Sequence, residues 1–556
     1  MQKYHNFRED CLYLNVFSPD TRSGFYPVMI YIHGGEFEFG SGNWFPGHML
    51  SASQEVVVVT FNYRLGALGF LSTGDNVSPG NYGMLDQVMA IQWVHDQIRY
   101  FRGDPERITL FGPGAGAASA GLHMVSPLTR NLIRRIIGQS GSPLADWAAI
   151  TNLERAYNTS RIFGTKLGCS HTSSQKLIDC LKHRSAKELS GFNFKADVGF
   201  FPWAPVVDRD IPNLRSEDRF LPDTPRTLFL SRHFNPHTEY LSGVTEEEAA
   251  YLLLHDSSMM IHNYVVTQEY INRKIKEYIL QYNYTLNSDQ VYQAMSFMYT
   301  YWADPYNPNR IRNEYVNMMS DALFKAPNDD MVKVMLVREV NVFMYVLNTT
   351  VEAFNWETWR RSPHDTEYYF LSGAPFMEPS FYPPDKLMDL GQNGYTERDR
   401  KMSAFFMQAF SNFAKHGQPA SSKMFGVEWT PMVQKPERIL YYLNINTDNS
   451  TIQQDYRQRE SAFWSNYLLT LIGHPPPTTP LPMEEQLDFQ IGFYSSIAAA
   501  VLFFVLFVIG CALYCGSSKR KRDYYDDDDY SNNQTDLNII NEKNESRYES
   551  QQHTTV

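Results

Sequence analysis

Residues 110–119 (LFGPGAGAAS) constrain the fold more than any other stretch, because almost all of them are small. A β-rich run, 107–111 (RITLF), leads into the stretch, and a run typical of a helix, 117–124, follows it. Glycines at positions 112, 114 and 116 allow backbone conformations that other residues avoid. The sequence therefore predicts a strand that turns sharply into a helix.

This stretch has the frame of a nucleophile elbow but lacks the nucleophile. In an elbow of the Gly-x-Ser-x-Gly type, the glycines permit a strained turn and the serine oxygen stands above the sheet. Here Gly112 and Gly116 supply the flanks, whereas Gly114 takes the place of the serine. We therefore expect a turn that has the geometry of a catalytic site and no group to attack a substrate.

Two apolar runs predict further strands of the same sheet. Residues 26–33 (YPVMIYIH) and 55–62 (EVVVVTFN) are short, continuous and apolar, as strands are when a mainly parallel sheet buries both faces. Residues 83–101 carry apolar side chains near helical spacing, which predicts a crossover helix. Strand, helix, strand and elbow together predict a doubly wound α/β fold.

Several landmarks occur in an order that resembles the cholinesterase and carboxylesterase family. They are EDCLYLN at 9–15, HGGEF at 33–37, FNYRLGALGF at 61–70, GNYGMLDQ at 80–87 and QSGSP at 139–143. The resemblance implies an α/β-hydrolase ectodomain over residues 1–473. Loss of the elbow serine, together with an apolar span near the C-terminus, implies the non-catalytic adhesion branch that includes neuroligins and gliotactin. Residues 112–121 are most similar to the gliotactin group.

The resemblance assigns the other two positions of a degenerate catalytic triad. It places the acid at Glu248, in the stretch GVTEEE, and the base at His364, in SPHDTE. Asp365 follows the histidine where the family usually has glycine. A base and its orienting acid with no nucleophile do not make an acyl-transfer catalyst, so we expect no enzymatic activity.

The resemblance also implies an altered oxyanion turn at Gly34, Gly35, Glu36 and Ala115. Hydrolases of this fold donate backbone N–H groups to the oxyanion from a His-Gly-Gly-Gly turn, and Glu36 replaces the third glycine here. A carboxylate that faced the pocket would oppose the developing negative charge. A Glu36 side chain that pointed outward would leave the N–H group free, and the sequence alone leaves both orientations open.

No other residue is a good nucleophile. Ser119 lies more than a helical turn beyond the elbow, and Ser140 and Ser142 belong to a stretch that active relatives also have beside their nucleophile. Gly-x-Ser-x-Gly does not occur elsewhere, and no histidine or cysteine cluster has metal-ligand spacing. We therefore expect neither a metal nor another cofactor.

Five cysteines are present, of which Cys511 and Cys515 lie in the apolar span near the C-terminus. The resemblance implies a Cys169–Cys180 disulfide, and two buried free thiols are the alternative. It also implies a partner upstream of Cys11. The opening residues contain no apolar signal-peptide region, so we expect a sequence truncated at its start, with a shortened isoform as the alternative.

The surface chemistry is that of an extracellular glycoprotein. Five N-glycosylation sequons are spread over the region before the apolar span, at Asn76, Asn158, Asn283, Asn348 and Asn449. The net charge of −12 argues against nucleic acid as a partner, because phosphate binding requires a basic face.

A change of composition after residue 473 predicts a membrane anchor. Residues 474–490 form a proline-rich stalk. Residues 491–516 are apolar and long enough to cross a bilayer as a helix, with a buried core helix as the alternative. The basic KRKR stretch at 519–522 should stay in the cytoplasm, which predicts a single-pass type I protein of the plasma membrane.

Residues 517–556 indicate a disordered cytoplasmic tail, because they are polar and poor in apolar residues. The acidic, tyrosine-rich run at 524–530 could also serve as a tyrosine kinase substrate. The sequence closes on HTTV, in which Thr554, Val556 and a free carboxylate are the groups that a PDZ groove binds by strand addition. We therefore expect a cytoplasmic PDZ scaffold as one partner.

Together these features predict a non-catalytic, cholinesterase-like transmembrane adhesion protein at cell–cell junctions, with an unidentified extracellular protein as its partner. The gliotactin resemblance implies septate, tricellular junctions of epithelial or glial barriers. One alternative is a neuroligin-like synaptic receptor for a neurexin-type ligand. The other is an active carboxylesterase with a non-standard nucleophile. The oligomeric state stays open, with a homodimer among the assemblies considered.

Overall fold

The two apolar runs near the N-terminus form adjacent strands that are buried on both faces. In the computed structural model, β2 (Tyr26–Tyr31) and β3 (Val57–Phe61) are buried along their whole length. Val28 and Ile30 pack into one apolar core, whereas Met29 packs into a second core on the other face of the sheet. This alternation follows from the two-residue period of a strand and explains why the run is continuously apolar.

The structure describes residues 9–20, 24–170, 173–191, 194–382, 390–420, 423, 426–432 and 439–473. Within these residues, nine strands form one sheet in the order β1-β3-β2-β4-β5-β6-β7-β8-β9. Strands β2 to β8 pair with one another in parallel, and β1 and β9 form antiparallel edges. The remaining strands are β1 (Leu14–Phe17), β4 (Gly103–Pro113), β5 (Arg135–Gln139), β6 (Glu239–Thr245), β7 (Val342–Leu347), β8 (Tyr441–Ile445) and β9 (Thr451–Gln454).

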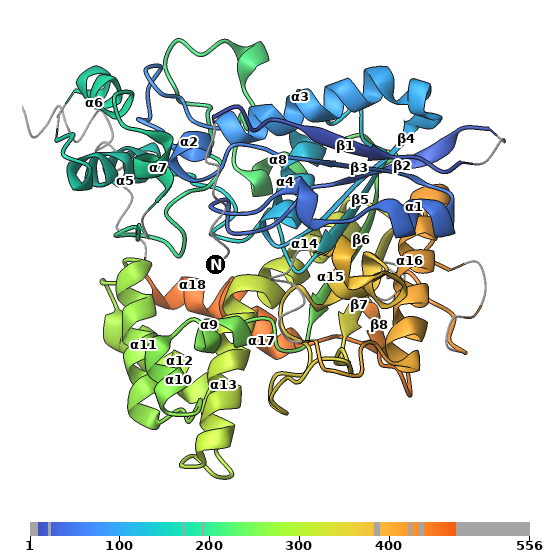
Figure 1. Ribbon diagram of the computed structural model, residues 1–556. Helices are drawn as coiled ribbons and strands as arrows, with labels where there is room; N and C mark the ends of the chain where they lie inside the picture. Colours follow the sequence, from blue (N-terminus) through green and yellow to red (C-terminus); the bar gives the residue numbers. More distant parts are fainter. Residues whose placement is uncertain are drawn as a thin grey trace, which may run out of the picture. The chain divides into compact units, whose positions relative to one another are not determined.

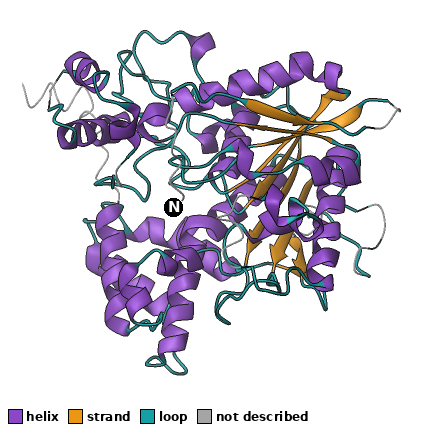
Figure 2. Cartoon of the chain, in the orientation of Figure 1, coloured by secondary structure: helices purple, strands orange, loops and turns teal. Residues whose placement is uncertain are grey.

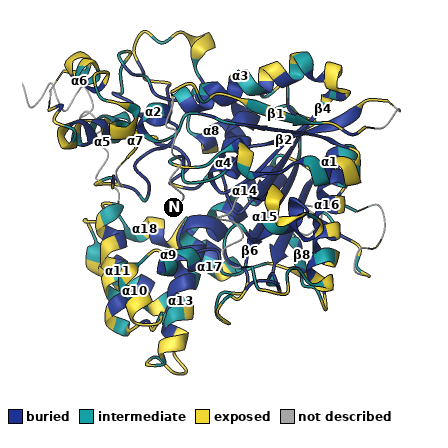
Figure 3. Ribbon diagram, in the orientation of Figure 1, coloured by how far each residue is buried: buried dark blue, intermediate teal, exposed yellow. Residues whose placement is uncertain are grey.

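Helices cover both faces of the sheet, which explains why its strands are dark blue in the burial view (Figures 1, 2 and 3). Helices α3 (Tyr82–Gln97), α4 (Ala115–Val125), α8 (Pro225–Leu230) and α14 (Ala326–Val337) contribute to the first core. Helices α1 (His48–Gln54), α15 (Thr366–Leu371) and α16 (Glu397–His416) contribute to the second. The α/β class expected from the sequence is confirmed.

Further helices lie beside the sheet (Figure 1). They are α2 (Gly66–Phe70), α5 (Leu153–Lys166), α6 (Ser174–Leu181), α7 (Ala186–Ser190), α9 (Ala250–Leu254), α10 (Ser257–Ile261), α11 (Gln268–Gln281), α12 (Ser288–Met298), α13 (Pro308–Ser320), α17 (Gln458–Ala462) and α18 (Leu468–Leu471). Three of them, α5, α9 and α11, contribute to or end at the walls of the cavities described below. A π-helical segment, Asp321–Lys325, joins α13 to α14. A second one, Phe463–Tyr467, joins α17 to α18.

The elements expected from the sequence exist, with small shifts at their ends. The run at 55–62 starts its strand two residues later, and the expected helix over 83–101 ends at Gln97 and continues as a 3-10 turn, Ile98–Phe101. The elbow strand is longer than its apolar core, because β4 also pairs with β2 through Gly103 and Asp104 before a shift of register.

The cysteines of the described residues divide as the resemblance implied. Cys169 and Cys180 form a disulfide between the end of α5 and helix α6, with Cα atoms 5.7 Å apart, which confirms the expected bond. Among the described cysteines, Cys11 has a free thiol and is half-buried. Its expected upstream partner stays a prediction.

Several expectations concern residues outside the described part of the chain. They are the stalk at 474–490, the apolar span at 491–516 and the tail at 517–556 with Thr554 and Val556. Over the residues that are described, no helix is long and apolar enough to cross a membrane. The sequons are all described: Asn76, Asn283 and Asn449 are exposed, and Asn158 and Asn348 are half-buried. Their glycosylation stays a prediction.

The disulfide should contribute measurably to stability. The change Cys169→Ser should lower the free energy of unfolding by about 3 kcal/mol, because the bond closes a loop of about a dozen residues in the unfolded chain. Urea unfolding measures this loss, and Cys11→Ser is the matched control with a small expected effect. Equal midpoints for the two variants, or a free thiol at Cys169 in an unreduced peptide map, would contradict the expectation.

Candidate functional site

The elbow forms where β4 runs directly into α4, with Gly114 as the single residue of the turn. Its backbone has φ 51° and ψ −114°, a strained conformation for a residue with a side chain. Its N–H group donates a hydrogen bond of 2.9 Å to the carbonyl of Gln139. A Cβ atom at Gly112 or Gly116 would lie 2.0 Å from the carbonyl oxygen of Ile32, so both flanking positions require glycine.

The residue assigned as the base lies beside the elbow, and the residue assigned as the acid is hydrogen-bonded to that base. His364 Nδ1 lies 2.6 Å from Glu248 Oε2, and Glu248 Oε1 accepts a 2.7 Å hydrogen bond from the backbone N–H of Thr245. A Cβ atom added at Gly114 would lie 2.9 Å from His364 Nε2. The structure therefore brings together the three positions of a triad, and the position that faces the histidine has no side chain.

The His364 ring carries a proton at neutral pH. Burial alone would lower its pKa, but the hydrogen bond to Glu248 and the charges of Asp365, Glu248 and Glu367 raise the pKa to about 9. A protonated imidazole has donors on both nitrogens and no lone pair for another proton. In this state His364 is a charged partner of Glu248 and cannot act as a general base.

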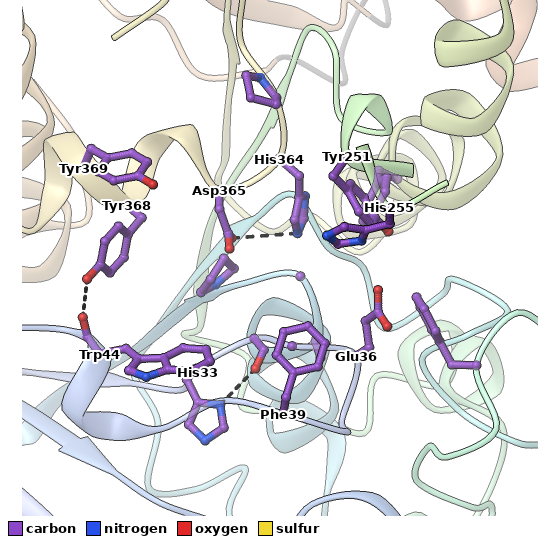
Figure 4. Close-up of a pocket in the computed structure, with 18 of the residues that line it drawn as sticks. His33, Glu36, Phe39, Trp44, Tyr251, His255, His364, Asp365, Tyr368 and Tyr369 are labelled. Atoms are coloured by element: carbon purple, nitrogen blue, oxygen red, sulfur yellow. Dashed lines mark hydrogen bonds and ion pairs between the residues drawn. The ribbon is translucent and has the colours of Figure 1, made fainter. Parts of the chain in front are cut away.

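Above the elbow lies a cavity of about 290 Å³ (Figure 4). Two of its rings contact the histidine: Phe324, from the π-helical segment, has its centroid 4.6 Å from the His364 ring, and Tyr251 has its centroid at 5.9 Å. Ten of its lining residues are aromatic: Tyr31, Phe39, Trp44, Trp147, Phe201, Tyr251, Phe324, Trp356, Tyr368 and Tyr369. The cavity thus combines an aromatic wall with charged groups around His364.

Two acidic side chains line this cavity in addition to the triad positions (Figure 4). Burial raises the pKa of Glu36 to about 7, and the charge of His364 offsets part of this effect. Asp365 Oδ1 lies 3.8 Å from His364 Nε2. Both acids have left-handed backbone, with φ 59° and 70°, the conformation that glycine adopts most easily.

The structure decides between the two orientations left open for Glu36, because its side chain lines the cavity and does not point outward. Gly34, Gly35 and Ala115, the other positions of the altered oxyanion turn, line the same cavity. With a pKa of about 7, Glu36 is ionised to a substantial degree at neutral pH, and in that form it opposes negative charge on a substrate oxygen. The site therefore lacks a nucleophile, and above pH 7 its turn also carries a charge unfavourable to an oxyanion.

The three serines considered as substitutes lie away from the cavity. Ser140 donates to Glu367 Oε1 at 3.4 Å, Ser142 donates to the carbonyl of Pro327 at 2.8 Å, and Ser119 is buried in α4. The described residues that line the cavity include no serine, threonine or cysteine. Nor do the described residues hold a group of three histidine, cysteine, aspartate or glutamate side chains that could bind a metal ion.

One buried acid in the site was not foreseen from the sequence. Glu367 accepts hydrogen bonds from Tyr345 Oη at 3.0 Å and from Ser140 Oγ at 3.4 Å. Burial, followed by the charge of Glu248, raises the pKa of Glu367 above its ordinary range. The only signal in the sequence was its position three residues after His364, which does not separate a buried acid from a surface residue at a helix start.

Comparison with known proteins identifies the family. The model of the carboxylesterase family matches residues 1–464. Acetylcholinesterase of Bungarus fasciatus is 30% identical, over 87% of this chain and 76% of that protein. Neuroligin-like protein glit-1 of Caenorhabditis elegans is 31% identical, over 84% of this chain and 65% of that protein. Neuroligin-2 of Mus musculus is 31% identical, over 84% of this chain and 56% of that protein.

The chain therefore spans less than two thirds of the length of these two neuroligin-type relatives. The family match, in contrast, covers nearly all of the described residues and includes the elbow, the acid and the base. The order of strands, the elbow and the paired histidine and glutamate agree with that match. The chain belongs to the carboxylesterase family.

Proposed function

We propose that this chain is a non-catalytic, cholinesterase-like adhesion protein at the cell surface. The observation that carries the proposal is the bare elbow, where Gly114 presents no side chain to His364. In a serine protease, removal of the nucleophile alone lowers the rate by about 10⁶. The protonated histidine adds to this loss because it cannot accept a proton. Glu36 adds to it in its ionised form, which is the major form above pH 7, because that form opposes an oxyanion.

The relatives support an adhesive role, since two of them are named as a neuroligin and a neuroligin-like protein. A large folded domain that performs no chemistry still offers a surface for protein recognition. The finer proposal is a gliotactin-like protein of septate, tricellular junctions, anchored by residues 491–516 and tethered by Thr554 and Val556 to a PDZ scaffold. A neuroligin-like receptor for a neurexin-type ligand is the alternative within the same class.

A weak esterase is the second candidate function. The close hydrogen bond between His364 and Glu248 and the acetylcholinesterase relative both favour it. Any nucleophile would have to come from the carboxylates or phenols that line the cavity, because no hydroxyl or thiol of serine, threonine or cysteine lines it among the described residues. His364 cannot activate any of these groups as a general base at neutral pH, because its ring already carries a proton.

The two functions are separated by one pair of assays. Non-adherent cells that display the full-length protein should form mixed aggregates with cells from a junction-forming epithelium, and deletion of residues 9–473 should abolish the aggregates. The same protein, purified, should turn over no short-chain ester above the buffer rate. Ester turnover that a fluorophosphonate abolishes, without cell aggregation, would overturn the proposed function.

A restored serine should recover little activity at neutral pH. The change Gly114→Ser places a hydroxyl beside His364, but a pKa of about 9 leaves roughly a hundredth of the histidine neutral at pH 7. Ester turnover should therefore increase as the pH rises through 9, and Glu36→Gly should increase it further. Gly114→Ala is the control without a hydroxyl. Full turnover by Gly114→Ser alone at pH 7 would show that Glu36 and Asp365 have little influence.

A further inference from the structure

A second cavity, of about 330 Å³, shares no lining residue with the cavity above the elbow. Its walls come from the turn before α5, the first turn of α5, residues 198–199, the start of α8, the end of α11 and α14. The polar residues that line it are Asp146, Thr151, Arg155, Thr224, Arg226, Tyr282 and Asp330. The cavity therefore combines acidic and basic groups within one small space.

The guanidinium of Arg155 has fewer hydrogen-bond acceptors around it than it has N–H donors. Its Nη2 donates to the carbonyl of Phe201 at 3.3 Å, while its Nε is buried and has no hydrogen-bond partner. A Cβ atom at Gly199 would lie 1.9 Å from Nη2, so the guanidinium packs directly on that backbone. A cation in the first turn of a helix is also unfavourable for the helix dipole. Neither capping nor internal hydrogen bonding accounts for Arg155.

Asp146 supplies the opposite charge without neutralising Arg155. Its side chain is exposed to the cavity, and it forms no hydrogen bond or ion pair with the described residues. Burial among surrounding atoms raises the pKa of its carboxyl, and the charge of Arg155 offsets part of this. Arg226, in contrast, already pairs with Asp330. Asp146 and Arg155 are thus the two unpaired charges of the cavity.

We infer that this cavity binds a small zwitterion of the α-amino-acid type. The carboxylate of such a ligand satisfies the free donors of Arg155, since guanidinium and carboxylate match in charge and geometry. The ammonium group satisfies Asp146. The carboxylate of Asp146 would repel a simple anion, and the guanidinium of Arg155 would repel a simple cation. Only a molecule that carries both charges is therefore favoured.

The other residues that line the cavity determine which side chain of the ligand fits. Leu144, Val198 and Pro225 present apolar surface to the same cavity. An apolar side chain of moderate size buries surface there and gains hydrophobic stabilisation. Leucine is therefore the probe of choice. The inference does not depend on adhesion or on the loss of hydrolysis, because the two cavities have separate linings.

Calorimetric titration of the full-length protein with three probes tests the inference. Leucine should bind, N-acetyl-leucine lacks the ammonium group, and leucine amide lacks the carboxylate. Each analogue should bind about tenfold more weakly or worse, because each leaves one charge of the cavity without its partner. Equal affinity for all three probes, or no binding of leucine at millimolar concentration, would overturn the inference.

Two variants assign each charge to its residue. Asp146→Asn should weaken leucine and abolish the preference for leucine over N-acetyl-leucine, and Arg155→Gln should do the same for leucine amide. Arg161→Gln, an exposed arginine on the same helix, is the matched control and should bind leucine as the unaltered protein does. If Arg155→Gln fails to fold, Asp146→Asn decides alone. If Asp146→Asn still preferred leucine over N-acetyl-leucine to the same degree, Asp146 would not be the residue that binds the ammonium group.

Discussion

The close approach of the elbow to the backbone of Ile32 is the contact on which the rest of the site depends. The Ile32 carbonyl leaves no room for a Cβ atom at Gly112 or Gly116, so two bare positions let β4 and α4 pack against β2. That packing holds residue 114 at φ 51° and aims it at His364. The elbow is thus a product of sheet and helix packing, and it forms without any nucleophile.

Charge balance explains how a histidine and a glutamate stay paired beside an elbow that has no nucleophile side chain. Glu248 is fully buried, and a buried carboxylate is costly unless a cation pairs with it. The His364 imidazolium supplies that cation, with its Nδ1 2.6 Å from Glu248 Oε2. Removing one partner of a buried ion pair costs about 3–5 kcal/mol, so the pair has a structural role independent of catalysis. The charge of Asp365 adds to that of Glu248 and raises the pKa of His364 further, which keeps the proton on the ring.

The sequence predicted the parts that depend on local pattern, namely the bare elbow and the strands at 26–33 and 55–62. The positions of Glu248 and His364 came from the family resemblance. The sequence did not predict the aromatic lining, because those rings come from segments far apart in the chain that only the fold brings together. Phe324 reaches the histidine through a π-helical segment that has no periodic signature. The orientation of Glu36 likewise depends on two consecutive left-handed residues, Glu36 and Phe37, which sequence patterns do not reveal.

The protonation state of His364 shows whether the ring is a charged partner of Glu248 or a general base. Nuclear magnetic resonance of the protein with isotope-labelled histidine reports that state, and the spectrum of His364→Gln assigns the signal. The ring should be an imidazolium at pH 7 that titrates near pH 9, because its pKa is raised to about 9. A neutral ring at pH 7, with titration near the ordinary value of about 6.5, would contradict this expectation.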